Sequence, residues 1–121
     1  SFVLKLIKMK TKKPIREHLA NFNLAGFSYY EGATCFKQLE IGTQVDVVLE
    51  EDNKYDPRAI AVYFKDYKLG FVPRQENRIL YKLLKVGLKT HIEMRIQKID
   101  PTDHPESQIH IVAHLIATSQ K

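Results

Sequence analysis

The chain of 121 residues has a single cysteine and no tryptophan. A lone cysteine cannot form a disulfide within the chain, which excludes a disulfide-stabilised scaffold and favours a reducing compartment. The sequence also lacks any apolar run near the ~20 residues that a membrane-spanning helix needs, and its N-terminal segment lacks a signal-peptide pattern. We therefore expect a cytoplasmic protein with no membrane association.

Proline and glycine are also few, with five of each, and they occur singly rather than in a linker. No internal repeat or low-complexity tract is present. A chain of this length has room for one domain with a single small core. We expect a basic N-terminal arm or extra element over residues 1–19, one folded domain over residues 20–116, and a short tail over residues 117–121.

Positive charge is concentrated in two segments. The net charge is +5, and residues 1–19 alone, with six basic residues and one acidic residue, account for it. Residues 65–98 hold nine basic and three acidic residues, whereas residues 20–64 hold three and seven. A nucleic-acid-binding surface is therefore expected on one segment of the domain rather than over the whole of it.

From residue 20 onward the pattern is mostly that of β-strands, with apolar residues at every second position. It predicts strands over residues 21–30, 44–49, 59–64, 67–72, 91–99 and 108–116. A two-residue turn at Asp66 joins the third and fourth strands as a hairpin. Several short strands with little helix predict a mainly β fold in the form of a small closed or half-closed barrel, because an open sheet would leave long edges unprotected.

The stretch RQENRILYKLLKVG over residues 74–87 breaks the alternation. Its apolar residues recur at helical spacing and are Ile79, Leu80, Leu83 and Leu84. Gly87 suits a helix C-terminus, so the pattern predicts one amphipathic helix over about residues 74–86. The basic residues share a second stripe and are Arg74, Arg78, Lys82 and Lys85. Such a stripe is usually a solvated face, and the alternative is a set of phosphate contacts made by Arg74, Arg78 and Lys82.

Catalytic and metal-binding patterns are weak. His110 and His114 are four residues apart, which on a strand places them ~13 Å apart and too far to share one ion. The acidic residues Glu50, Glu51, Asp52 and Asp56 come from one loop, whereas a magnesium site usually needs acids from several elements. No phosphate-binding glycine loop, serine elbow or Cys-His arrangement is present. We expect a binding module rather than an enzyme, with no metal or other cofactor.

Two stretches place tyrosines at the ends of predicted strands: GFSYYEG over residues 26–32, where alternation predicts that Tyr29 and Tyr30 lie on opposite faces, and EDNKYDPRAIAV over residues 51–62. Together with an L-x-x-G step at Leu39–Gly42 and LGFVPRQENRILYKLL over residues 69–84, they resemble the HIRAN domain family. The resemblance covers about residues 20–116. Its most specific part runs from Asn53 through Tyr55 and Asp56 into the strand that contains Ala59, Ile60 and Val62.

The resemblance implies a six-stranded barrel related to OB and SH3-like folds, with a second short helix beside the amphipathic one. It also implies binding of the 3′-hydroxyl end of single-stranded DNA. Tyr29 would stack on a terminal base, Asn53, Tyr55 and Asp56 would line the pocket for the last nucleotide, and Arg74 would contact a phosphate. Ser28 departs from the family, because the helicase-attached member has a basic residue before the tyrosine pair.

The residues themselves allow this chemistry. Tyr55 offers a flat face for a base, with stacking worth ~1–3 kcal/mol, while Pro57 stiffens the loop. Asp56 can accept a hydrogen bond from a hydroxyl and would repel a phosphate. The alternative is a purely structural role, in which Asp56 caps the loop through a backbone N–H and Tyr55 packs on the hairpin. The structural role and the binding role are compatible.

We therefore expect a module that binds a free 3′ end of single-stranded DNA and serves DNA repair or replication-fork processing, with a DNA-processing enzyme supplied in trans. The first alternative is a barrel that binds a protein or a small ligand without nucleic-acid specificity. A lesser alternative is a metal-dependent nuclease built on the acidic loop. Salt separates the first two, because strand binding weakens steeply with salt and apolar docking does not.

Overall fold

The computed structural model describes residues 15–117 and contains six antiparallel strands in one sheet. The strands are β1 (Arg16–Asn23), β2 (Gln44–Leu49), β3 (Ile60–Phe64), β4 (Tyr67–Phe71), β5 (Ile92–Ile99) and β6 (Ile109–Ile116). The sequence prediction of six strands and a mainly β fold is confirmed. Most of the predicted basic arm lies outside the described residues, and β1 already begins at Arg16.

Two α-helices and four short 3-10 turns accompany the strands of the described part. The helices are α2 (Gly32–Cys35) and α3 (Arg74–Lys85), and the turns are η1 (Phe27–Tyr29), η2 (Phe36–Gln38), η3 (Lys89–His91) and η4 (Pro105–Ser107). None of these helices is long and apolar enough to cross a membrane. The implied second short helix is present as α2.

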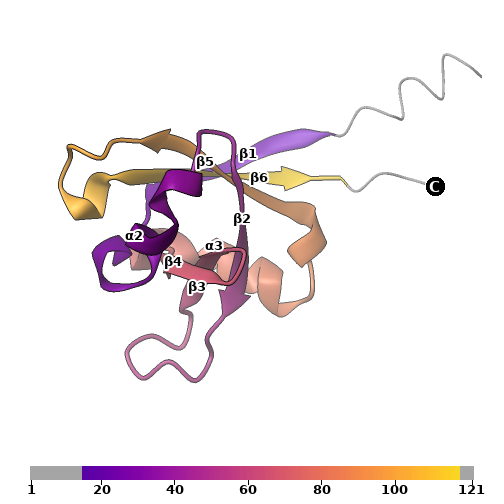
Figure 1. Cartoon of the computed structure of the whole chain (residues 1–121). Coiled ribbons are helices and arrows are strands. Elements are labelled where there is room, and N and C mark those ends of the chain that lie inside the picture. Colours follow the sequence, from indigo (N-terminus) through magenta and orange to yellow (C-terminus); the bar gives the residue numbers. More distant parts are fainter. Residues whose placement is uncertain (1–14, 118–121) are drawn as a thin grey trace, which may run out of the picture.

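The sheet has the strand order β1-β6-β5-β2-β3-β4 and is not closed by a ladder between its two edge strands. Figure 1 shows β1, β5 and β6 grouped on one side, β3 and β4 with α3 on the other, and β2 running between the two groups. A single bridge joins the edges, because Ala25, just beyond β1, pairs with Phe71 of β4. The fold is thus a curled sheet that one residue pair brings close to a barrel.

This bridge depends on Gly70. Its φ of 155° lies in a region that side chains disfavour, and a Cβ there would lie 2.3 Å from the carbonyl oxygen of Ala25. The absence of a side chain lets the chain after β1 approach β4, so that Ala25 and Phe71 exchange two backbone hydrogen bonds of 2.9 and 2.8 Å. Ala25 and Phe71 both line the pocket described below.

One apolar cluster fills the space inside the curled sheet. The alternation in β2 and β3 points Val45, Val47, Ile60 and Val62 inward, and all four are buried. Burial of such a side chain contributes about 1.5–3 kcal/mol relative to leaving it exposed. Cys35 is also buried, and burial raises the pKa of its thiol, so the thiol stays protonated and unreactive at neutral pH.

Helix α3 lies close to its predicted bounds, but its buried face is shifted from the predicted one, of which Leu80 and Leu84 pack on the core. Ile79 is 55% exposed, whereas Asn77 and Leu80 are buried and Tyr81 packs on the core. The helix therefore packs through positions i, i+3, i+4 and i+7 starting at Asn77, a face that begins with a polar residue. Its end is a Schellman motif, in which the N–H groups of Gly87 and Leu88 donate to the last carbonyls.

The prediction of a strand over residues 21–30 is correct only in its first part, because β1 ends at Asn23. Gly26 adopts a left-handed conformation with a φ of 73°, which turns the chain out of the sheet and into η1. Tyr29 and Tyr30 therefore lie in and just after a 3-10 turn rather than on opposite faces of a strand.

Candidate nucleic-acid interface

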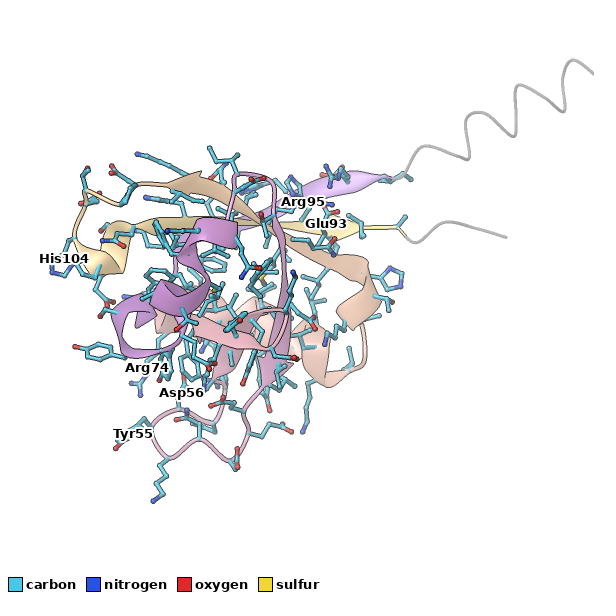
Figure 2. All side chains as sticks on the ribbon, in the orientation of Figure 1. Tyr55, Asp56, Arg74, Glu93, Arg95 and His104 are labelled. Carbon is cyan, nitrogen blue, oxygen red and sulfur yellow. The ribbon has the colours of Figure 1, made fainter. Side chains whose placement is uncertain are left out.

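The loop between β2 and β3 is held in shape by its own side chains. The Oδ1 atom of Asn53 accepts hydrogen bonds from the backbone N–H groups of Tyr55 (2.8 Å) and Asp56 (3.1 Å). This is an Asx turn, the reason why asparagine is favoured at such positions. With the loop backbone fixed, Tyr55 extends from its tip and is 84% exposed (Figure 2). Tyr55 therefore does not pack on the hairpin, and the purely structural role that the sequence allowed for it is wrong.

Asp56 closes the other half of the loop. Its Oδ1 accepts from the N–H of Arg58 at 2.9 Å, and its Oδ2 accepts from the Nδ2 of Asn77 at 2.9 Å. The expected capping role of Asp56 is therefore present. The Asp56 side chain is still 18% exposed, so part of it remains accessible to a ligand.

Asn77 joins the loop to helix α3 and is the only polar residue buried in the described part of the chain, at 4% exposed. Its Nδ2 donates to Asp56 and also to the carbonyl oxygen of Arg58 at 3.1 Å. A buried amide without partners would be destabilising by about 1–3 kcal/mol, so these two bonds are what allow it to lie there. Asn77 was not identified from the sequence, because an asparagine within a helical pattern resembles a surface residue.

Arg74, the first residue of α3, lies beside the loop. Its Nε is 3.7 Å from the Oδ2 of Asp56, and its Nη2 donates to the carbonyl oxygen of Tyr55. The N-terminus of α3 also carries a partial positive charge that favours anions. The cation nearest to Asp56 is thus Arg74 rather than its sequence neighbour Arg58. Because the Arg74 side chain is 70% exposed, it remains accessible to a ligand.

Tyr30 and Phe71 supply an aromatic wall. Their ring centroids are 5.6 Å apart in an edge-to-face arrangement with an interplanar angle of 62°. The Nζ of Lys68 lies 4.9 Å from the Tyr30 ring centroid and 4.5 Å from that of Phe71. Neither Tyr30 nor Phe71 was predicted as a site residue.

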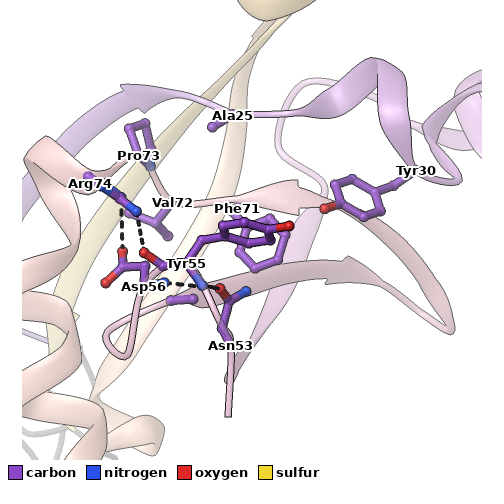
Figure 3. Close-up of a pocket in the computed structure, with 10 residues that line it drawn as sticks. Ala25, Tyr30, Asn53, Tyr55, Asp56, Phe71, Val72, Pro73 and Arg74 are labelled. Atoms are coloured by element: carbon purple, nitrogen blue, oxygen red, sulfur yellow. Dashed lines mark hydrogen bonds and ion pairs between the residues drawn. The ribbon is translucent and has the colours of Figure 1, made fainter. Parts of the chain in front are cut away.

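These elements enclose one pocket of about 240 Å³. It is lined by Ala25, Tyr30, Asn53, Tyr55, Asp56, Ala59, Phe71, Val72, Pro73 and Arg74. Figure 3 shows Tyr30 and Arg74 at opposite ends of the pocket, with Tyr55 between them. Four of the seven residues predicted to bind DNA meet here, namely Asn53, Tyr55, Asp56 and Arg74.

The other three predicted residues lie outside the pocket lining. Tyr29 is 81% exposed in η1, next to Tyr30, which lines the pocket. Arg78 and Lys82 are exposed on α3, one and two turns beyond Arg74. Within residues 15–117 neither Arg78 nor Lys82 forms an ion pair, so both charges face solvent there.

Lys85, the last basic residue of the stripe, already forms an ion pair. Lys85 pairs with Glu51 at 2.5 Å, and the hydroxyl of Tyr81 donates to the same carboxylate at 2.9 Å. These hydrogen bonds from Lys85 and Tyr81 hold the pKa of Glu51 below its usual range. The carboxylate also raises the pKa of Lys85, so both groups stay charged at neutral pH. The loop between β2 and β3 therefore contacts α3 at two places: Asp56 bonds to Asn77, and Glu51 bonds to Tyr81 and Lys85.

The acidic residues of this loop do not converge. Glu50 pairs with Lys68, Glu51 with Lys85 and Asp56 with Arg74. Within residues 15–117 no group of three or more histidine, cysteine or acidic side chains is arranged to hold a metal ion.

His114 lies against His18 with ring centroids 5.9 Å apart, and burial together with the nearby Arg16 and His18 lowers the pKa of His114.

Comparison with known families decides the class of the domain. A family model for the HIRAN domain matches residues 18–115. The chain belongs to the HIRAN domain family. A search of curated proteins found no match.

Solved structures agree with the HIRAN assignment. The crystal structure of a protein from Lactobacillus plantarum is 19% identical, with a TM-score of 0.74 over 88% of this chain and 100% of the other. The crystal structure of the HIRAN domain of human HLTF is 16% identical, with a TM-score of 0.58 over 84% of this chain and 77% of the other. At these identities the likeness establishes the HIRAN fold and does not transfer a ligand. HIRAN domains are DNA-binding modules, and membership of the family places this chain in that class.

Proposed function

We propose that this HIRAN domain binds the free 3′-hydroxyl end of single-stranded DNA. In this proposal the last nucleoside enters the pocket between Tyr30 and Tyr55, and Asp56 accepts a hydrogen bond from the 3′-hydroxyl. Tyr29 offers its exposed ring to a base outside the pocket, and the backbone follows α3 past Arg74, Arg78 and Lys82. The domain contributes binding, and a DNA-processing enzyme supplied in trans contributes the chemistry.

The observation that carries the proposal is the convergence of Asn53, Tyr55, Asp56 and Arg74 with an aromatic wall in one small pocket. Pockets that bury a drug-sized ligand usually measure about 300–1,000 Å³. At about 240 Å³ this pocket suits one terminal nucleoside and not a run of stacked bases. A site of that size favours an end over the interior of a strand.

Asp56 has the free capacity that the proposal needs. A carboxylate offers about four lone-pair sites, and Asp56 uses two of them for the hydrogen bonds from Arg58 and Asn77. A terminal hydroxyl can therefore donate to the exposed part of the carboxylate. A terminal phosphate would bring negative charge against that carboxylate. Arg74 offsets part of this charge, and its place at the N-terminus of α3 suits it to the preceding phosphate instead.

Two features limit the strength of binding. Ser28 stands where the helicase-attached relative has a basic residue, so one phosphate contact is missing. The acidic loop beside the pocket makes a poor surface for duplex DNA, which favours broad positive coverage. The second feature favours a short single strand held at its tip, the kind of ligand that DNA repair or replication-fork processing presents.

A fluorescence titration tests the proposal with a short labelled single strand and a blunt duplex of the same length. We expect the single strand to bind more tightly, because only unpaired bases can stack on Tyr29, Tyr30 and Tyr55. Equal affinity for the blunt duplex would contradict the proposal.

A second candidate function is protein docking. An apolar groove of about 360 Å³ lies away from the pocket, and its lining includes Leu83, Leu88, Leu115 and Ile116. Such grooves serve as contact sites for partners. Salt distinguishes the two functions, because partner capture through this groove should persist at high salt while strand binding weakens.

The nuclease alternative has less support, because Glu50, Glu51 and Asp56 each form an ion pair with a different basic residue. Incubation of the pure protein with an end-labelled single strand and Mg²⁺ or Mn²⁺ tests it directly. We expect the strand to remain intact.

A further inference from the structure

An ion pair lies behind the aromatic wall and lines no part of the pocket. Lys68 of β4 and Glu50, just after β2, are joined at 2.6 Å between Nζ and Oε2. Their side chains are only 20% and 24% exposed. Removing two charges from water is costly, so a half-buried pair of this kind calls for a local role. None of the DNA contacts proposed above uses it.

Lys68 contacts both rings of the wall. Its ammonium lies 4.9 Å from the Tyr30 ring centroid and 4.5 Å from that of Phe71, within the ~6 Å over which a cation is attracted to an aromatic face. Its backbone also exchanges hydrogen bonds with Glu31, the residue after Tyr30, at 2.9 and 2.8 Å. One residue therefore contacts both rings and the chain next to Tyr30.

Glu50 extends the same network to the loop. Its Oε2 accepts from Lys68, while its Oε1 accepts from the Nδ2 of Asn53 at 3.3 Å. Asn53 in turn holds the backbone of Tyr55 and Asp56 through its Oδ1. The carboxylate thus links the two walls of the pocket, with one oxygen on each side.

The charge state of the pair suits this arrangement. Burial lowers the pKa of Lys68, but the hydrogen bond and the negative charge of Glu50 raise it by more. The pKa of Lys68 therefore lies above its usual value, and the ammonium stays charged throughout the neutral range.

We propose that Lys68 and Glu50 are positioning residues that hold the aromatic wall and the loop in the geometry that receives a single-stranded end. The inference rests on the proposed function for its ligand. A wall that is already ordered loses less conformational entropy when a base stacks on it, which strengthens binding without a new contact.

Two other roles make different predictions. A residue that only stabilises the fold would change the free energy of unfolding and leave affinity unchanged. A residue that contacts a phosphate directly would change the salt dependence of binding, by roughly 0.7 in the slope of log affinity against log salt for each contact on a single strand. Positioning changes affinity at an unchanged slope.

The central variant is Lys68→Met, which keeps the apolar stem and removes the charge. Its matched control is Lys65→Met, because Lys65 lies in the same hairpin with its Nζ 5.2 Å from the Phe64 ring, which lies outside the pocket. We expect Lys68→Met to bind a short 3′-hydroxyl single strand about three- to tenfold more weakly than the parent. Lys65→Met should match the parent, and Lys68→Arg should retain most of the affinity.

Further variants guard against a folding defect. The double variant Glu50→Gln/Lys68→Met leaves no unpaired half-buried carboxylate, and we expect it to bind as weakly as Lys68→Met. In a Tyr30→Ala background the effect of Lys68→Met should shrink, because the ring that the ammonium holds is gone. Full additivity with Tyr30→Ala would contradict positioning through this ring.

A measurement without DNA separates this inference from the proposed function. We expect the NMR ring resonances of Tyr30 and Phe71 to broaden or shift toward averaged values in Lys68→Met and to stay unchanged in Lys65→Met. If the parent does not bind a single strand, the proposed function fails while the ring signals still test positioning. Unchanged ring signals with unchanged affinity, or a salt slope lowered by roughly 0.7, would overturn the inference.

Discussion

The two walls of the pocket are built in different ways. The loop wall comes from one segment, in which Asn53 and Asp56 bond to N–H groups only two or three residues away. The aromatic wall joins Tyr30 to Phe71 and Lys68, which are far from it in sequence. The first wall is a local structure that α3 braces, and the second exists only when the whole sheet has curled. A substitution that destabilises the curled sheet should therefore disrupt the aromatic wall before it disrupts the loop wall.

The largest expected effect is that of Gly70→Ala. The new Cβ would lie 2.3 Å from the carbonyl oxygen of Ala25 at a φ of 155°, so the bridge between the sheet edges must open. We expect a loss of about 2–4 kcal/mol in the free energy of unfolding, measured by denaturant titration.

Gly42→Ala is the matched control for this change. Gly42 also has a positive φ, 93°, but nothing lies within 4 Å of an added Cβ. We expect a smaller loss of about 1–2 kcal/mol from backbone strain alone. Equal losses for the two variants would show that the bridge at Ala25 adds nothing.

Asn77→Ala addresses the loop wall. It leaves the Oδ2 of Asp56 and the carbonyl of Arg58 without their buried donor, so we expect a loss of about 1–3 kcal/mol in the free energy of unfolding. Gln75→Ala, at an exposed position of the same helix, should change stability by less than about 0.5 kcal/mol. Loop amides of Asn77→Ala should also exchange faster in hydrogen-exchange measurements, and unaltered exchange would show that the loop holds itself without α3.

The tyrosines distinguish the pocket from its surroundings. Tyr30→Ala and Tyr55→Ala should each weaken binding of a single strand by about 1–3 kcal/mol, and the loss should persist with a ligand as short as a dinucleotide. Tyr29→Ala should weaken binding of a longer strand only, because the proposal assigns its ring to a base outside the pocket. A loss for Tyr29→Ala on the dinucleotide, with none for Tyr30→Ala, would exchange their roles.

The smallest effect concerns the basic stripe on α3. Replacing Arg78 and Lys82 by glutamine should lower the slope of log affinity against log salt by roughly 1.4, which is roughly 0.7 for each lost phosphate contact. The control Lys65→Gln, in the turn between β3 and β4, should leave the slope unchanged. If the double variant also keeps the parental slope, Arg78 and Lys82 form only a solvated face.

The loop wall could be predicted from the sequence because its causes are local. An asparagine and an aspartate before an alternating apolar segment predict a turn that their own side chains hold, and Asn53 and Asp56 form it. The strands and α3 could be predicted for the same reason, because the spacing of apolar residues that indicates each of them lies within a single segment. The link from Asp56 to Asn77 could not be predicted, because 21 residues separate them.

The aromatic wall could not be predicted for a related reason. Alternation predicted that Tyr29 and Tyr30 lie on opposite faces of a strand, but the left-handed turn at Gly26 ends the strand first. Which ring enters the pocket is decided by the contact of Tyr30 with Phe71, and therefore by the pairing of distant segments. The predicted apolar face of α3 was only partly correct for the same reason. Leu80 and Leu84 pack on the core, but Asn77 is buried through its hydrogen bonds to Asp56 and Arg58.

Recognition of a strand end is the central claim, and one short strand in three forms tests it most directly. The forms carry a 3′-hydroxyl, a 3′-phosphate, or no end because the strand is circular. We predict that the hydroxyl form binds tighter than either of the others by about tenfold or more, which is about 1.4 kcal/mol. Asp56→Asn should remove most of the difference between hydroxyl and phosphate, while Asp52→Asn in the same loop should not. A circle that binds as tightly as the hydroxyl-ended strand would contradict end recognition and leave Tyr55 and Asp56 as parts of a stable turn.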